Sequence, residues 1–171
     1  MRFLVIQDYK ENRAKCTAAP LEGLSGVEIV RLGHPAGSRE EFELPPGVLL
    51  EVGAPPLARS DLALVEEGAV ILVDATWARV GKVLRRCAVR PGAALERRSL
   101  PRGFVTAYPR TSKLRADPPE GLATVEAMFA ATAVLGAPRP EFLAGYRWAD
   151  AFLRRSADAV REFCPALAPR V

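Results

Sequence analysis

The chain has 171 residues, of which 49% are hydrophobic and 26% are charged, a composition typical of a globular domain with a sizeable core. No apolar run approaches the roughly 20 residues that a membrane-spanning helix needs, and the apolar segment at the N-terminus is too short for a signal peptide. We therefore expect a cytoplasmic protein with no membrane partner. The 24 Lys and Arg residues exceed the 20 Asp and Glu residues, and the resulting net charge of +4 favours nucleic acid as a partner only weakly.

The cysteine and histidine content argues against two common kinds of catalytic site. The three cysteines, Cys16, Cys87 and Cys164, lie far apart and form neither a disulfide framework nor a Cys-x-x-Cys metal motif. His34 is the only histidine, and no motif supports it, which disfavours a zinc site and a Ser-His-Asp triad. We therefore expect a protein without a bound metal.

The first part of the chain contains two strand signals. Phe3 to Gln7 and Val27 to Leu32 are rich in apolar residues and predict strands, separated by a polar loop that is rich in Lys and Arg. Residues 35–47 contain Gly, Pro, Ser and acidic residues, so they form a loop or a domain joint. We predict a small N-terminal α/β subdomain over residues 1–46.

The next segment has the spacing of a βαβ unit. Val48 to Val52 predicts a strand, and Ser60 can cap a short helix that ends at Gly68. The apolar run Ala69 to Val73 then predicts a strand that is buried on both faces. A strand, a helix and a second strand in this spacing indicate a parallel sheet, which we assign to a domain over residues 47–171.

Asp74 and Trp77 follow the buried strand directly. Thr76 can cap a helix that carries Trp77 and Cys87 on its apolar side, while basic residues lie on the other side at helical spacing. An acid and an indole at the carboxyl end of a buried strand occupy the place where open α/β sheets bind ligands. The alternative interpretation is that Asp74 helps to cap the helix and Trp77 belongs to the core. The pattern alone leaves both interpretations open.

The rest of the chain predicts one more strand and two helices. Phe104 to Tyr108 predicts the strand, and a long loop follows to Gly121. Thr124 can cap a helix over Val125 to Leu135, and an amphipathic helix is expected from Pro140 to Phe163.

The basic residues are grouped, but no glycine-rich phosphate loop accompanies them. If the groups converge they form a phosphate-binding surface, and otherwise they are a solvated basic surface. Neither Gly-x-Gly-x-x-Gly nor a Walker sequence is present, which disfavours a Rossmann dehydrogenase or a P-loop NTPase. The residues fit a site for a neutral or zwitterionic ligand beside a polyanion.

Five short segments, in order along the chain, carry a family resemblance. They are Asp8-Tyr-Lys10 with Lys15-Cys-Thr17, Val73-Asp-Ala-Thr-Trp77, Arg98-Ser-Leu-Pro101, Leu122-Ala-Thr-Val-Glu-Ala127, and Phe142 to Leu153 with Tyr146-Arg-Trp148. Together they resemble the signature segments of the rRNA aminocarboxypropyltransferase family, whose members complete a hypermodified pseudouridine in small-subunit rRNA.

This resemblance implies a fold, a co-substrate and a reaction. The fold would be α/β and SPOUT-like, with a parallel sheet and a trefoil-knotted C-terminal half. The co-substrate would be S-adenosylmethionine, whose 3-amino-3-carboxypropyl group is transferred to N3 of a uridine or pseudouridine while methylthioadenosine leaves. The partner would be ribosomal RNA or a precursor of the small ribosomal subunit. We also expect the protein to be a monomer.

The resemblance also assigns roles to residues. Those implied to bind S-adenosylmethionine are Thr17, Leu49, Val73, Trp77, Leu100, Glu120 and Thr124. Asp74 would orient Thr17 or act as a base, and we favour orientation because an ordinary carboxylate is a poor match for the proton on a uracil N3. Those implied to bind RNA are Lys15, Arg79, Lys82, Arg86, Arg110 and Lys113.

Two segments depart from the family pattern and widen the choice of function. The family's Ala-Ala-Asn-Pro-Val-Asn-Tyr-Gly loop is replaced here by Thr106-Ala-Tyr-Pro-Arg-Thr-Ser-Lys113, and its Leu-Ser-Pro segment by Leu50-Glu-Val. Asp74-Ala-Thr-Trp77 matches the Asp-x-Thr-Trp motif of the DTW-domain proteins, which transfer the same group to a tRNA uridine. A non-catalytic RNA-binding paralogue and a SPOUT methyltransferase are two further hypotheses.

Overall fold

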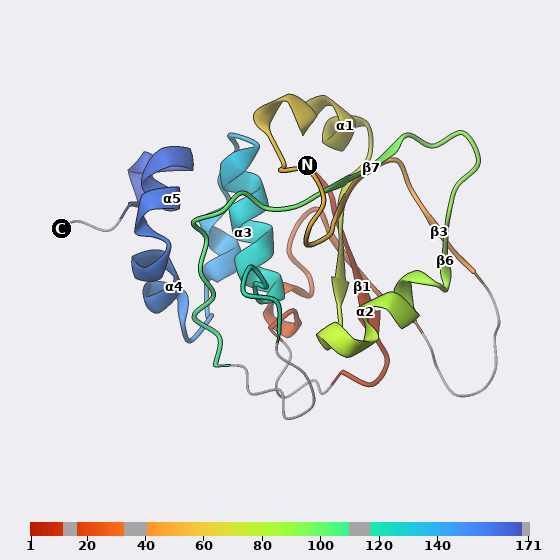
Figure 1. The fold of residues 1–171 in the computed structure, drawn as a ribbon, viewed down its shortest axis with the longest axis horizontal. Helices are drawn as coiled ribbons and strands as arrows, with labels where there is room; N and C mark the ends of the chain where they lie inside the picture. The colour runs from red at the N-terminus through yellow and green to blue at the C-terminus, as the bar shows by residue number, and fades with distance from the viewer. Residues whose placement is uncertain (12–16, 33–40, 110–116, 169–171) are drawn as a thin grey trace.

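A five-stranded parallel sheet forms the centre of the molecule (Figure 1). The structure is a computed structural model, and it describes residues 1–11, 17–32, 41–109 and 117–168. The strand order is β2-β1-β5-β4-β7, and every neighbouring pair is parallel. The strands are β1 (Phe3–Asp8), β2 (Val27–Leu32), β4 (Gly47–Leu50), β5 (Ala69–Asp74) and β7 (Leu95–Arg98).

The two central strands explain why the sheet is parallel and buried. All six residues of β1 are buried, as are five of the six in β5, so both strands lack the polar alternation of a half-exposed strand. β1 pairs with β2 on one side and with β5 on the other. The predicted parallel α/β sheet is therefore confirmed. Strands from both sides of residue 46 pair in this sheet, and the predicted domain boundary there stays a prediction.

Helices cover both faces of the sheet. Alternate residues of the strands pack on α1 (Leu62–Glu67) and α3 (Thr124–Val134) on one face and on α2 (Trp77–Leu84) on the other. In α3, ten of the eleven residues are buried, because the helix lies between the sheet and the pair α4 (Ala149–Arg155) and α5 (Ala157–Phe163), as Figure 1 shows. No helix in the described ranges is long and apolar enough to cross a membrane.

Three strands were not expected from the sequence. β3 (Phe42–Leu44) and β6 (Cys87–Val89) form a separate two-stranded parallel sheet. The prediction that Cys87 lies on the preceding helix is wrong, because α2 ends at Leu84 and the chain turns so that Arg86 accepts a hydrogen bond from the Phe42 N–H. β7 is the edge strand of the main sheet and consists of Leu-Glu-Arg-Arg, a sequence without strand-like hydrophobicity.

The segment predicted as a strand from Phe104 to Tyr108 is not one. Its backbone groups bond to side chains instead of a neighbouring strand. The Val105 N–H donates to Ser156 Oγ (2.9 Å), and the Ala107 N–H donates to Glu126 Oε1 (2.9 Å). The completely buried Glu126 also accepts from Tyr146 Oη (2.9 Å). This carboxylate therefore ties three segments together.

The helix predicted over Pro140 to Phe163 is divided into three parts. A 3-10 turn (Pro140–Leu143) comes first, and α4 and α5 follow with Ser156 between them. Ser156 is fully buried, and its side chain bonds the Val105 backbone as described above. The buried hydroxyl at the junction of the two short helices therefore fixes the Val105 backbone against them.

We predict that Gly47 is required for the pairing of β4 with β5. A Cβ at position 47 would lie 2.0 Å from the Ala69 carbonyl oxygen, whereas a Cβ at Gly53 would meet nothing within 4 Å. Both glycines have positive φ, so each alanine substitution costs about 1 kcal/mol in conformation. Gly47→Ala should cost about 1–3 kcal/mol more than Gly53→Ala. Equal losses of unfolding free energy in urea would contradict this account.

Candidate functional site

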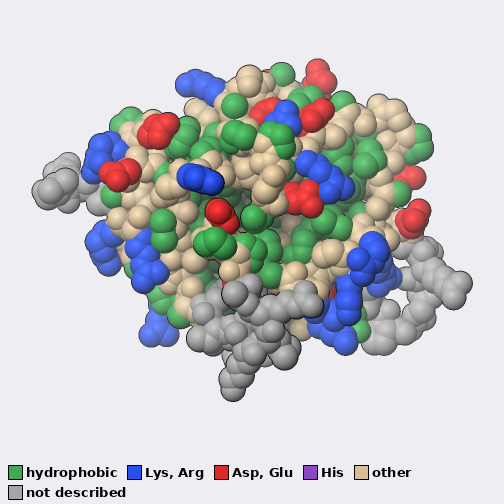
Figure 2. Space-filling model, viewed as in Figure 1, with side chains coloured by type: hydrophobic (Ala, Val, Ile, Leu, Met, Phe, Trp, Pro, Cys, Tyr) green, Lys and Arg blue, Asp and Glu red, His purple; other side chains and the backbone are tan. Residues whose placement is uncertain are grey.

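A cavity of about 950 Å³ opens at the carboxyl ends of β4, β5 and β7. The residues after these strands line it, together with one side of α2 and the first turn of α3. The cavity thus lies where parallel α/β sheets bind ligands. On the face shown in Figure 2, hydrophobic side chains are exposed around the centre, and Lys and Arg side chains lie among them as well as at the left edge and at the lower right.

Most of the residues predicted to bind the small molecule line this one cavity. They are Val73, Trp77, Leu100, Glu120 and Thr124, and Asp74, predicted to orient a side chain or to act as a base, lines the same cavity. Two predicted residues lie elsewhere. Leu49 packs in the core with Ile71 because strand side chains alternate between faces, and its neighbour Leu50 lines the cavity. Thr17 is half-buried and does not belong to the cavity lining.

A row of hydrogen bonds runs across three strands to the cavity. The parallel register places Arg31 on β2, Gln7 on β1 and Asp74 on β5 side by side. Arg31 Nε donates to Gln7 Oε1 (2.7 Å), and Gln7 Nε2 donates to Asp74 Oδ2 (2.8 Å). Thr124 Oγ1, at the start of α3, donates to Asp74 Oδ1 (2.7 Å). Sequence reasoning missed Gln7 and Arg31, although Gln7 is a polar residue in an otherwise apolar run.

Trp77 forms one wall of the cavity against the turn that precedes α3. A Cβ at Gly121 would lie 2.7 Å from Trp77 Cζ2, so the indole packs directly on the glycine backbone. The Gly121 N–H donates to the Pro118 carbonyl (2.8 Å), which shapes this turn. The glycine is required here because any side chain would displace the ring.

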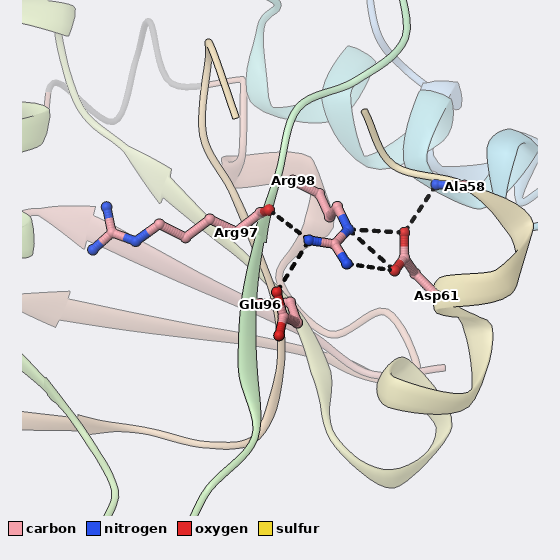
Figure 3. A network of polar contacts seen from close by, with 5 residues as sticks. All are labelled: Ala58, Asp61, Glu96, Arg97 and Arg98. Carbon is pink, nitrogen blue, oxygen red and sulfur yellow. Dashed lines mark hydrogen bonds and ion pairs between the residues drawn. The ribbon is translucent and has the colours of Figure 1, made fainter. Parts of the chain in front are cut away.

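The opposite wall is held by an ion-pair network around Arg98, at the end of β7 (Figure 3). Arg98 Nε lies 3.1 Å from both carboxylate oxygens of the buried Asp61, and Asp61 Oδ2 accepts from the Ala58 N–H (2.9 Å). The hydrogen bond to Asp61 raises the pKa of Arg98. Arg98 Nη1 also donates to Glu96 (3.1 Å), as Figure 3 shows.

Backbone hydrogen bonds next to Arg98 also hold the cavity wall. Next to Arg98, the Ser99 N–H donates to the Pro55 carbonyl (2.8 Å), and the Leu57 N–H donates to the Ser99 carbonyl (2.7 Å). Ser99, Leu100 and Pro101 all line the cavity. The Arg98–Asp61 ion pair joins the same two segments of the chain, so the arginine of the Arg-Ser-Leu-Pro segment helps to position this wall.

The predicted RNA-binding residues differ in their exposure and in their interactions with the rest of the protein. Lys15, Arg110 and Lys113 lie outside the described residues. Arg79 forms an ion pair with Asp8, whose side chain is only 2% exposed, and Arg79 Nη2 donates to Asp8 Oδ1 (3.0 Å). Lys82 on α2 is exposed, and Arg86 just beyond the helix is half-buried.

The pair of Asp8 and Arg79 fastens α2 to the end of β1. Burial raises the pKa of Asp8, but the hydrogen bonds from Arg79 and from the Lys10 backbone outweigh it, so the pKa lies below its usual value. Asp8 therefore stays ionised and paired in the folded protein at neutral pH.

We predict that this pair stabilises the fold in a pH-dependent way. Since the folded-state pKa of Asp8 is lowered, the stabilisation is present above the unfolded-state pKa and disappears as the pH falls through the folded value. Asp8→Asn should therefore lower the unfolding free energy by about 2 kcal/mol at pH 7, and the difference should shrink below about pH 4.

The control is Glu43→Gln, which removes the carboxylate of an exposed ion pair with Arg90. It should change stability by less than about 0.5 kcal/mol. A loss for Asp8→Asn that is the same at pH 3 and pH 7 in urea titrations would exclude the ionic contribution.

A second prediction decides between the two interpretations of Trp77. The side chain is half-buried and lines the cavity, so Trp77→Ala should cost less than about 2 kcal/mol of unfolding free energy. Phe152, which is completely buried, serves as the comparison, and Phe152→Ala should cost about 3–5 kcal/mol. A loss for Trp77→Ala as large as that for Phe152→Ala would make Trp77 a core residue.

The part of the chain that the structure describes contains no group of three His, Cys, Asp or Glu residues that could hold a metal ion.

No protein-family model matches the sequence, and no curated protein matches it. Among solved structures, the SAM-dependent rRNA acp-transferase Tsr3 from Vulcanisaeta distributa matches with a TM-score of 0.67 and 22% sequence identity, covering 96% of this chain and 84% of that chain. The chain therefore shares its fold with this transferase over nearly its whole length, which confirms the resemblance predicted from the five segments.

Proposed function

We propose that the protein is an S-adenosylmethionine-dependent aminocarboxypropyltransferase that modifies a uridine or pseudouridine of small-subunit rRNA. The observation that carries this proposal is the cavity itself. It combines apolar walls with the Asp74–Thr124 pair, and it lies at the strand ends of a fold shared with an rRNA acp-transferase.

The cavity fits S-adenosylmethionine in size and in the character of its walls. Small-molecule sites commonly enclose roughly 300–1,000 Å³, and this cavity has about 950 Å³. Leu50, Val73 and Leu100 offer apolar surface to the adenosine. The Trp77 ring is suited to lie beside the positively charged sulfonium, because an indole face attracts cations.

The amino-acid end of the ligand fits beside Thr124. This residue lines the cavity at the first position of α3, where backbone N–H groups and the helix dipole favour a carboxylate. The Thr124 hydroxyl lies next to the same place. A zwitterionic amino acid therefore matches the polar part of the cavity.

The proposed transfer needs positioning more than acid–base chemistry. N3 of the base attacks the Cγ carbon beside the sulfonium, an N–C bond forms, and the C–S bond breaks with its electron pair going to sulfur. Neutral methylthioadenosine leaves, and the N3 proton goes to solvent. Because the sulfonium is already an activated leaving group, alignment of the two reactants is the main task of the protein.

Asp74 fits an organising role in this scheme. Its two oxygens accept hydrogen bonds from Gln7 and Thr124, so the carboxylate orients the hydroxyl of a residue that lines the cavity. The family resemblance implies that Asp74 orients Thr17, whereas these hydrogen bonds support Thr124 as the residue that it orients.

The RNA-binding surface, the topology of the C-terminal half and the assembly state remain predictions. We propose that RNA phosphates are bound by the exposed Lys82 together with Arg86, Lys15, Arg110 and Lys113. Arg79 should contribute less to RNA binding, because it is ion-paired with Asp8. We also propose the trefoil knot, the cytoplasmic location and the monomeric state. A tRNA uridine is the second candidate target, on the ground of the Asp74-Ala-Thr-Trp77 motif.

A dual-label transfer assay tests the proposed reaction. S-adenosylmethionine is supplied with one isotope in the carboxyl group and another in the methyl group, together with unmodified small-subunit rRNA or tRNA. We expect the carboxyl label in rRNA and the methyl label in methylthioadenosine. Methyl label in RNA with S-adenosylhomocysteine as the product would show a methyltransferase instead, and transfer to tRNA alone would support the second target.

The matched variants for this assay lie on one helix. Thr124→Val keeps the shape of a residue in the cavity but removes its hydroxyl, whereas Thr132→Val removes a buried hydroxyl from α3 away from the cavity. Thr124→Val should lower the rate of transfer by about tenfold or more. Thr132→Val should have the wild-type rate when the rate is expressed per amount of folded protein. Equal transfer activities of the two variants would show that the Thr124 hydroxyl has no role in the site.

A further inference from the structure

The row of hydrogen bonds from Arg31 to Thr124 has a fixed direction. An arginine side chain can only donate, so the Gln7 atom that faces Arg31 Nε must be the amide oxygen. The Gln7 NH₂ group therefore faces Asp74, which accepts it as a carboxylate. No other orientation of the amide satisfies both contacts.

The same logic fixes the hydroxyl of Thr124. A carboxylate has no proton to give, so the contact of 2.7 Å between Thr124 Oγ1 and Asp74 Oδ1 uses the threonine proton. Thr124 lines the cavity, and its oxygen can offer only lone pairs to a bound group. The site therefore presents a hydrogen-bond acceptor there, beside the start of α3.

We infer that Arg31 and Gln7 are positioning residues that hold Asp74 and Thr124 so that the Thr124 oxygen accepts a hydrogen bond from the α-ammonium group of the co-substrate. The inference rests on the proposed function and adds to it a specificity for a protonated amine. Gln7, Asp74 and Thr124 are 3%, 8% and 6% exposed, so water competes little for these bonds. Arg31 reaches the row from the sheet edge, where its side chain is 42% exposed and Glu22 holds it by an ion pair of 3.2 Å.

The effect of this row should appear in ligand discrimination. A hydrogen bond between a charged group and a buried acceptor commonly changes affinity by about tenfold or more. We therefore expect the protein to bind S-adenosylhomocysteine at least about tenfold more tightly than an analogue in which hydrogen replaces the α-amino group. Both ligands share the adenosine and the carboxylate, so the ratio of their dissociation constants reports on the amine alone.

Calorimetric titration of both ligands into the wild type and four variants tests the inference. Arg31→Met and Gln7→Met should reduce the preference for the amine to about threefold or less, mainly by weakening the amino ligand, while Arg31→Lys, which still donates to Gln7, should restore part of it. Arg2→Met is the matched control. Arg2 is ion-paired with Glu28 (3.6 Å) near the other end of the same two strands and should leave the preference unchanged.

The outcomes separate the inference from the proposed function. Wild-type binding with an unchanged preference in Arg31→Met and Gln7→Met would overturn the inference and leave the proposed function intact. A wild type that binds neither ligand would overturn both. Circular dichroism checks that each variant is folded. If Gln7→Met unfolds, Arg31→Met still tests the inference, because Arg31 is an exposed residue on an edge strand and its replacement should leave the fold intact.

Discussion

The parallel pairing of β1 with β5 is the constraint on which the rest of the structure depends. It aligns Gln7 with Asp74, two residues that are 67 positions apart in the chain, at the carboxyl end of the sheet. Asp74 then holds Thr124 and with it the start of α3. A one-residue slip in this register would turn Gln7 to the opposite face of the sheet and break the row.

The two walls of the cavity depend on contacts of different kinds. On one side, the Trp77 ring packs directly on the backbone of Gly121, and any side chain at position 121 would clash with the ring. On the other side, Arg98 and the buried Asp61 form an ion pair that fixes the strand end before Leu100. A partly buried pair of this kind is costly to break, because removal of one partner leaves a charge without compensation. Arg98 itself is thus explained by the wall that it holds in place and not by contact with a ligand.

The sequence predicts the interior of the fold well, and its edges poorly, for a physical reason. β1, β5 and α3 are buried almost completely, so their apolar runs are recognisable. β7 is an edge strand with charged residues, and it forms only because β4 offers backbone partners. The segment from Phe104 to Tyr108 has the composition of a strand, but Ser156 and Glu126 satisfy its backbone groups. Motifs identify Asp74, Trp77 and Thr124, whereas Gln7 and Arg31 depend on a register between distant strands that no local pattern contains.

A crystal structure of the protein with S-adenosylmethionine tests the central claim most directly. We expect the adenosine to lie against Leu100, with the sulfonium beside Trp77 and the amino-acid end at Thr124, where the α-ammonium donates to the threonine oxygen. The Cγ carbon should then face the opening of the cavity. A ligand bound outside this cavity, or one whose methyl group faces the opening while the amino acid points away from Thr124, would contradict the account.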